Sequence, residues 1–245
     1  MPPAIPTLVI NLDRDADRWA AISRRLEDLA FLAVTRIAGV YGKDLPAAAR
    51  FALTRNRFWM AFRGELGCFL GHARAWEAVA EQATPCLVLE DDAIPVGLER
   101  LVGLPVPADA DLVFVNDRMA TGDAPSGDIP CCLPVTEAVQ MLNRTGRGVG
   151  TDGYLLTPEG ARRLLAAVER DLFFGHVDWR LLRYSLREHD FAGDLAGTRC
   201  EEIVRHHHNP NLPPQWGVLR SYCLDHPLVR IPDGPHHSSR IEANA

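Results

Sequence analysis

Three consecutive carboxylates at the end of a short apolar run are the residues of this chain best suited to chemistry. Residues 86–89 are typical of a buried strand, and Glu90, Asp91 and Asp92 follow them directly. Ligands of open α/β sheets gather beyond the carboxyl ends of such strands. Because neighbouring acids repel one another and are costly to desolvate, we expect a hard divalent cation that holds a phosphorylated substrate here. In the alternative, Asp91 or Asp92 caps a turn and Glu90 points into water.

A second candidate site follows the first predicted strand, which spans residues 7–11. Arginines in a loop of this kind can face phosphate, and a carboxylate or an amide can hydrogen-bond a ribose or a base. The alternative is an ordinary helix N-terminus, with acids that favour the dipole and arginines that face solvent. The residues of this candidate nucleotide-binding loop are Asn11, Leu12, Asp13, Arg14 and Arg18.

Asp13 and Asp15 also imitate the D-x-D opening of haloacid-dehalogenase-like phosphatases. That opening follows its strand directly and is followed by a small hydroxyl residue, whereas Ala16 stands here. A metal-dependent phosphatase is therefore a minor alternative.

Composition indicates one sizeable core and argues against nucleic acid as a partner. The chain has 245 residues, 47% of them hydrophobic and 24% charged, as in ordinary globular proteins. A net charge of −6 does not suit broad binding to nucleic-acid phosphates. The six cysteines lack C-x-x-C spacing, so we expect reduced, mostly buried thiols. Because no leader or spanning segment is evident, we expect a cytoplasmic protein with at most peripheral contact to the inner membrane.

Alternating strand and helix patterns predict an α/β sandwich with a mainly parallel sheet. A first domain spans residues 1–200. Residues 201–245 lose periodicity and are rich in proline, so we expect an extended C-terminal tail packed on the same domain. The segment 121–134 is expected to be a mobile loop. Strands are predicted at 7–11, 34–37, 86–89, 111–116 and 153–157, and helices at 17–30, at 64–82 and from 158 onward, with Thr157 as its cap.

Six sequence blocks, in order along nearly the whole chain, resemble glycosyltransferase family 25. This family includes bacterial lipooligosaccharide galactosyltransferases and procollagen galactosyltransferases. One block, G-E-L-G-C-F-L-G-H, departs from the family pattern at Gly71, where a serine is usual. The blocks are residues 9–14, 64–72, 87–93, 150–156, 176–178 and 238–241.

The resemblance implies a GT-A-type fold that binds a nucleotide sugar, a divalent metal and inversion at the anomeric carbon. The implied donor is a UDP-sugar, with galactose as the first choice. The implied acceptor is a glycan of lipooligosaccharide or surface polysaccharide synthesis in a bacterium. The alternative is a non-catalytic family member that binds a nucleotide sugar or glycan, an idea kept open by Gly71.

Within this resemblance, Glu90 and Asp92 take the part of a D-x-D pair that binds Mn²⁺ or Mg²⁺. A late histidine often completes such a metal shell, and His208 and His237 are the candidates. Three adjacent histidines, at 206–208, cannot all converge on one ion, so the alternative for each is a solvated turn. The expected donor-binding residues are Asn11, Leu12, Asp13, Arg14, Arg18, Glu90, Asp91 and Ser239.

Inversion requires a base that takes the proton of the acceptor hydroxyl, and three acids are candidates. We favour Asp178, because it lies between apolar Val177 and Trp179 where burial would raise its pKa. Its alternative role is that of a helix N-cap. Asp152 and Glu65 are the other candidates. The aromatic and basic stretch 55–63 is expected to contact the acceptor.

Overall fold

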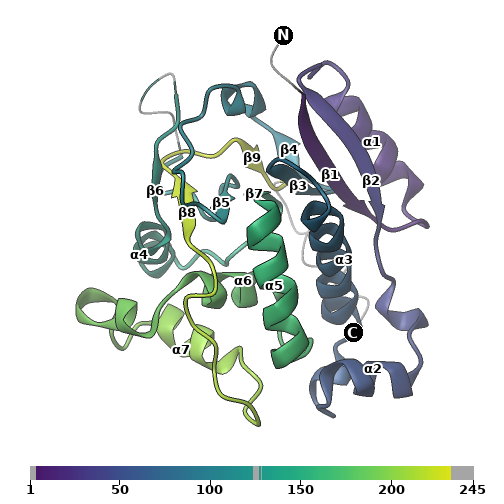
Figure 1. The fold of residues 1–245 in the computed structure, drawn as a ribbon, viewed down its shortest axis with the longest axis vertical. Helices are drawn as coiled ribbons and strands as arrows, with labels where there is room; N and C mark the ends of the chain where they lie inside the picture. Colours follow the sequence, from purple (N-terminus) through teal and green to yellow (C-terminus); the bar gives the residue numbers. More distant parts are fainter. Residues whose placement is uncertain (1–3, 124–126, 128, 233–245) are drawn as a thin grey trace.

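A computed structural model describes residues 4–123, 127 and 129–232 (Figure 1). The strands are β1 Ile5–Asn11, β2 Leu32–Ala38, β3 Cys86–Glu90, β4 Ile94–Pro95, β5 Leu112–Phe114, β6 Cys132–Pro134, β7 Gly153–Leu156, β8 Ser221–Leu224 and β9 Val229–Arg230. The α-helices are α1 Ala16–Leu26, α2 Ala47–Thr54, α3 Arg63–Ala80, α4 Val135–Thr145, α5 Pro158–Asp171, α6 Val177–Ser185 and α7 Arg199–His206.

A seven-stranded sheet in the order β2-β1-β3-β7-β5-β8-β6 organises the molecule. Strands β1, β2, β3, β5 and β8 run in one direction, and β7 and β6 run in the other. The predicted α/β architecture with a mainly parallel sheet is thereby confirmed. Strands β4 and β9 form a separate two-stranded sheet.

Two hydrophobic clusters cover the two faces of this sheet. Val88 on β3 packs with Phe69 and Trp76 of α3, whereas its neighbours Leu87 and Leu89 pack in the other cluster, which includes α1. This alternation is what a strand buried on both faces requires, since successive side chains point to opposite sides. Helices α3 and α5 lie side by side over the first face (Figure 1).

The chain after Cys200 is not an extended tail over the residues that the structure describes. It continues through α7 and then supplies β8, which lies inside the large sheet between β5 and β6. The expectation is wrong here because a four-residue strand between proline-containing segments has no readable periodicity, and its partner strand β5 lies about a hundred residues earlier. The expected loop 121–134 likewise ends in β6, which pairs with β8. Residues 233–245 lie outside the described part.

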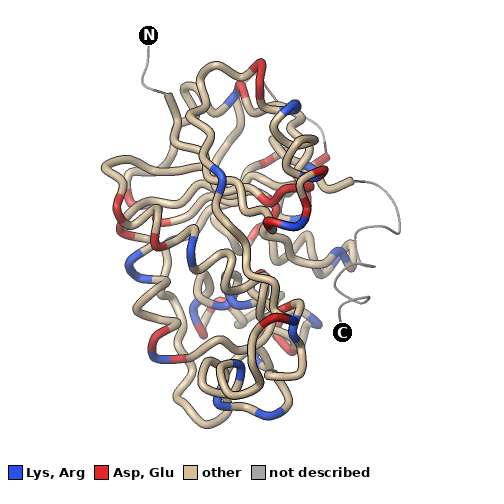
Figure 2. Tube along the Cα trace, turned by 90° about the vertical axis from the view of Figure 1, so that its right-hand side faces the viewer, with Lys and Arg blue, Asp and Glu red and all other residues tan. Residues whose placement is uncertain are grey.

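Charged residues are interspersed along the trace in Figure 2, and in that view Lys and Arg do not gather on one face. All six cysteines have free thiols. Among the helices of residues 4–123, 127 and 129–232, none is both long and apolar enough to cross a membrane.

Helix α3 makes a close approach to the chain that follows β2, and Gly67 permits it. A Cβ at Gly67 would lie 2.5 Å from the backbone oxygen of Val40. Gly67→Ala should gain up to about 1 kcal/mol of helix propensity but lose about 1–3 kcal/mol to the clash, because a backbone atom cannot move aside easily. We therefore expect a lower free energy of unfolding in urea titrations. Gly148→Ala, where a Cβ would meet nothing within 4 Å, is the control and should change stability little. Equal stability of the two variants would contradict the expectation.

Candidate active site

A cavity of about 390 Å³ opens where β1 and β3 end. These strands are parallel neighbours, with Ile10 opposite Glu90, so their carboxyl ends meet at one edge of the sheet. The N-terminal half of α3, the chain at 39–43 and the start of α6 form the other walls. The predicted site residues that line this cavity are Asn11, Leu12, Arg18, Glu65, Glu90, Asp91, Asp92 and Asp178.

Four predicted site residues of the described chain do not line the cavity. Asp13 is exposed and pairs with Arg36, and the Arg14 guanidinium lies over the ring of Tyr41. His208 follows the end of α7, where its Nδ1 lies at hydrogen-bond distance from the backbone oxygen of Arg205. The fourth, Asp152, is fully buried behind the cavity wall. The remaining two candidates, His237 and Ser239, lie outside the described residues.

One arginine joins two members of the acidic triplet. Arg18 Nη2 lies 2.5 Å from Asp91 Oδ1 and 2.5 Å from Asp92 Oδ2. Asp91 also accepts a hydrogen bond of 2.7 Å from Asn11 Nδ2. Burial raises the pKa of Asp91 to about 6, although Arg18 and Asn11 oppose the shift. The sequence analysis expected a positive charge beside the three acids, and Arg18 of α1 supplies part of that charge. Asn11, expected to bind the donor, instead holds Asp91 by a hydrogen bond.

Three carboxylates nevertheless form a set that fits a hard cation. One oxygen from each of Glu90, Asp92 and Asp152 lies within 4.8 Å of the other two. Carboxylate oxygens are the ligands that Mg²⁺ and Mn²⁺ prefer. The predicted Glu90–Asp92 pair is thus brought together, and Asp152, expected as a base candidate, joins it as a third possible ligand.

Arg118, which the sequence analysis missed, forms a two-point ion pair with Asp152. Its Nε lies 3.0 Å from Asp152 Oδ2 and its Nη2 lies 2.6 Å from Oδ1. Burial raises the pKa of Asp152, and the charges of Glu90 and Asp92 add to that rise against the attraction of Arg118. A Cβ at Gly150 would collide with the Arg118 guanidinium, so glycine leaves the slot that Arg118 fills. Arg118 follows the predicted strand 111–116, as the three acids follow residues 86–89. The argument that ligands gather beyond the carboxyl ends of strands would therefore have identified Arg118 as well.

Among the base candidates, Asp178 is the best placed. It lines the cavity at the second position of α6, whose N-cap is His176, so the alternative that Asp178 is the N-cap is wrong. Burial raises its pKa, as expected, and the charge of Glu90 adds to the rise, whereas Arg118 and His176 oppose it. Both oxygens of Asp152 accept from Arg118, which leaves that carboxylate poorly placed to receive a proton. Glu65 lines the cavity at the N-terminus of α3 and remains the other candidate.

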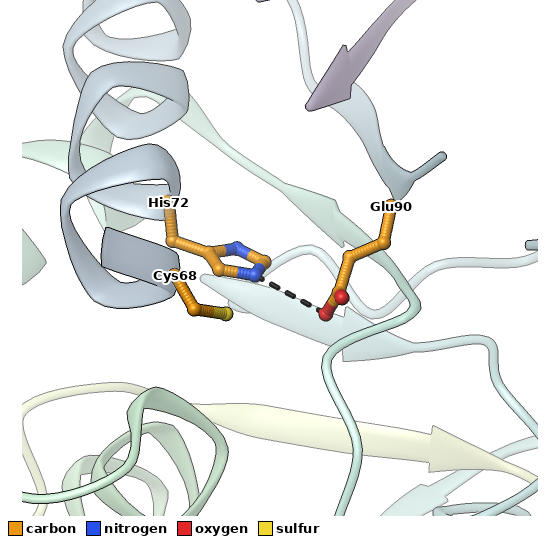
Figure 3. Close-up of side chains that lie close together, drawn as sticks. All are labelled: Cys68, His72 and Glu90. Atoms are coloured by element: carbon orange, nitrogen blue, oxygen red, sulfur yellow. Dashed lines mark hydrogen bonds and ion pairs between the residues drawn. The ribbon is translucent and has the colours of Figure 1, made fainter. Parts of the chain in front are cut away.

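Glu90 accepts two hydrogen bonds on one oxygen. Thr151 Oγ1 donates to Glu90 Oε1 over 2.8 Å, and His72 Nε2 lies 3.3 Å from the same oxygen (Figure 3). Burial acts to raise the pKa of Glu90, but the hydrogen bonds from His72 and Thr151 and the positive charge of Arg118 outweigh burial and lower that pKa. Glu90 is therefore ionised at neutral pH. Cys68 lies beside the pair, with a thiol pKa that burial raises well above its usual value.

Comparisons with known proteins agree with the motifs. Residues 4–96 match the model of glycosyltransferase family 25, described as an LPS biosynthesis protein. Procollagen galactosyltransferase 1-B of Xenopus laevis is 32% identical over 113 residues, which cover 43% of this chain and 17% of that relative. These matches support a glycosyltransferase. They support the predicted family over residues 4–96, which match the family model and hold three of the six motif blocks.

Proposed function

We propose that this protein is a metal-dependent, inverting glycosyltransferase with a GT-A-type fold. It moves galactose from UDP-galactose to a glycan acceptor of lipooligosaccharide or surface polysaccharide synthesis, in the cytoplasm and at most at the membrane surface. The observation that carries the proposal is the convergence of Glu90, Asp92 and Arg118 on one cavity at the ends of β1 and β3. The relative's printed name, a galactosyltransferase, favours galactose.

In this proposal, Glu90 and Asp92 hold Mn²⁺ or Mg²⁺, which supplies Lewis-acid stabilisation of the charge on the leaving nucleotide. Arg18, released in part from the acids, and Arg118 bind the diphosphate. Arg118 uses Nε and Nη2 for Asp152, and its Nη1 has no hydrogen bond within the described residues. A guanidinium fixed on one edge and open on the other is suited to an anionic ligand.

Asp178 is the base in this proposal. It takes the proton of the acceptor hydroxyl while the new C1–O bond forms and the bond from C1 to the phosphate oxygen breaks on the opposite face. The aromatic stretch expected to contact the acceptor lies next to α6. Trp59 packs edge-on against His176, with ring centroids 6.0 Å apart, and Phe58 beside it is 63% exposed. Aromatic faces of this kind suit the apolar sides of a sugar ring.

The remaining alternatives have little support. A Cβ at Gly71 would lie 3.1 Å from Cγ2 of Ile10, so glycine allows α3 to approach β1 and packing accounts for the missing serine. The phosphatase reading required Asp13 and Asp15 to face one pocket, but Asp13 is not among the residues that line the cavity.

A panel of UDP-sugars with Mn²⁺ tests the proposal, with released UDP as the measured product. We expect UDP-galactose to give the fastest release, and a glycan acceptor to increase it. Binding of UDP-sugars without release would favour the non-catalytic alternative. Phosphate release from monoesters, with no reaction of any UDP-sugar, would favour the phosphatase.

A further inference from the structure

A line of buried hydrogen bonds, which we call the relay, leads from Trp76 in the core through Tyr154 and His72 to Glu90. Trp76 Nε1 donates to the Tyr154 hydroxyl over 2.9 Å, and that hydroxyl lies 2.9 Å from His72 Nδ1. On the other side of the ring, His72 Nε2 lies 3.3 Å from Glu90 Oε1 (Figure 3). Trp76, Tyr154 and His72 are all fully buried. Each polar hydrogen in this line therefore needs a partner within the line itself.

Counting the hydrogen-bond donors and acceptors along this line indicates the tautomer of His72. An indole N–H can only donate, so the Tyr154 oxygen accepts from Trp76 and must pass its own proton to its other neighbour, His72 Nδ1. The ring then carries its proton on Nε2 and donates it to Glu90. A proton on Nδ1, in the other tautomer or in the charged ring, would point at the phenol oxygen and leave the Tyr154 hydrogen with no acceptor.

We infer that His72 is a positioning residue that donates a hydrogen bond from Nε2 to Glu90 and so holds it, and that Tyr154 and Trp76 set the tautomer of the ring. Thr151 donates to the same oxygen, Oε1. Oε2 has no hydrogen bond within the described residues, so it is the oxygen of Glu90 that is left for a ligand in the cavity. The function of the relay is to fix which oxygen of Glu90 is offered and in which direction.

The same geometry argues against a soft-metal site formed by Cys68, His72 and Glu90. Cys68, His72 and Glu90 each offer an atom within 4.8 Å of the others, and a Cys and a His four residues apart on a helix resemble a site for a soft metal (Figure 3). A metal at His72 Nε2 would displace the proton that the relay places there. It would also require the thiolate of Cys68, which burial and the nearby Glu90 disfavour.

The tautomer can be measured directly in the unaltered protein. In ¹⁵N-labelled protein, histidine long-range correlation spectra distinguish a proton on Nε2 from one on Nδ1. We expect His72 to be the Nε2–H form, with its signals assigned by their loss in His72→Gln. Tyr154→Phe, which keeps the ring packing and removes only the hydroxyl, should release the ring into a mixture of tautomers. An Nδ1–H or doubly protonated ring in the unaltered protein would overturn the inference.

A matched pair of variants tests the positioning role. The amide nitrogen of His72→Gln reaches where Nε2 lies, whereas that of His72→Asn reaches only as far as Nδ1. Since an outer-shell donor is worth roughly 10–100-fold in metal affinity, His72→Asn should weaken Mn²⁺ binding by about tenfold or more in EPR titrations, and His72→Gln should restore most of it. Equal Mn²⁺ affinity of His72→Asn and the unaltered protein would contradict the role.

This second test rests on the proposed metal site, and the two failures can be told apart. If the unaltered protein bound no Mn²⁺, the proposed metal dependence would be wrong. The measured tautomer of His72 would still test the inference about the hydrogen-bond line. Co²⁺ provides the opposite probe. We expect no thiolate-to-cobalt charge-transfer band. A band that disappears in Cys68→Ser would establish the soft-metal site and overturn the inference.

Discussion

Asp92→Asn is expected to lower metal-dependent UDP release by about a thousandfold or more, since metal stabilisation of a transition-state charge is worth several kcal/mol. Asparagine keeps the shape and one oxygen of the side chain but removes the charge that holds the cation. The fold should survive, because Arg18 keeps its ion pair with Asp91. Initial rates with UDP-galactose, Mn²⁺ binding by EPR and the melting temperature together test this.

The control for that variant is Glu159→Gln on α5, which removes one exposed acid that is not among the residues lining the cavity. It should leave turnover, Mn²⁺ affinity and melting temperature close to those of the unaltered protein. Turnover of Asp92→Asn equal to that of this control would remove the metal from the proposed mechanism.

Asp178→Asn is the second large effect that we expect, with kcat lower by about 10²–10⁴-fold, the usual contribution of a general base. The base acts in its ionised form, so kcat of the unaltered enzyme should rise with pH through the raised pKa of Asp178. The residual rate of the variant should lack that rise. If Asp178→Asn kept both its kcat and the increase of kcat with pH, Asp178 would not be the base, and Glu65 would be the next candidate.

Although Asp178→Asn should lower kcat, it should not lower the free energy of unfolding at neutral pH. Burial raises the pKa of Asp178 in the folded state above its unfolded value, so the folded state binds this proton more tightly. Stability is therefore lost as pH rises from the unfolded to the folded pKa, and the loss is complete above the folded pKa. Asparagine cannot ionise, so at neutral pH the variant should be at least as stable in urea titrations. A large loss of stability would mean that the carboxylate itself supports the fold.

The regular elements near the site were readable because their signals are local. The buried strand β3 ends within a residue of its predicted bound, and α5 begins at Pro158 with the Thr157 hydroxyl accepting from the Gly160 amide over 3.0 Å. Strand β8 was missed because its place in the sheet depends on partners far away in the chain. The same holds for β9, which pairs with β4 across more than a hundred residues.

The candidate site was partly predictable for the same reason. The end of a strand fixes the position of a residue that follows it, which is why Asn11, Glu90 and Asp91 lie together as expected. Side-chain direction within a turn is not fixed in this way, and the turn after β1 aims Asp13 at Arg36 outside the cavity lining. The position of Arg118 after the strand 111–116 could have been predicted in the same way, but its ion pair with Asp152 depends on space at Gly150, which only the three-dimensional packing shows.

The most direct test of the central claim is anomalous diffraction from crystals of the protein soaked with Mn²⁺ and UDP. The account predicts one manganese peak within coordination distance of the Glu90 and Asp92 carboxylates, with the diphosphate between that ion and the Arg118 guanidinium. A structure in which Asp92 stays paired with Arg18, and manganese binds elsewhere or not at all, would contradict it.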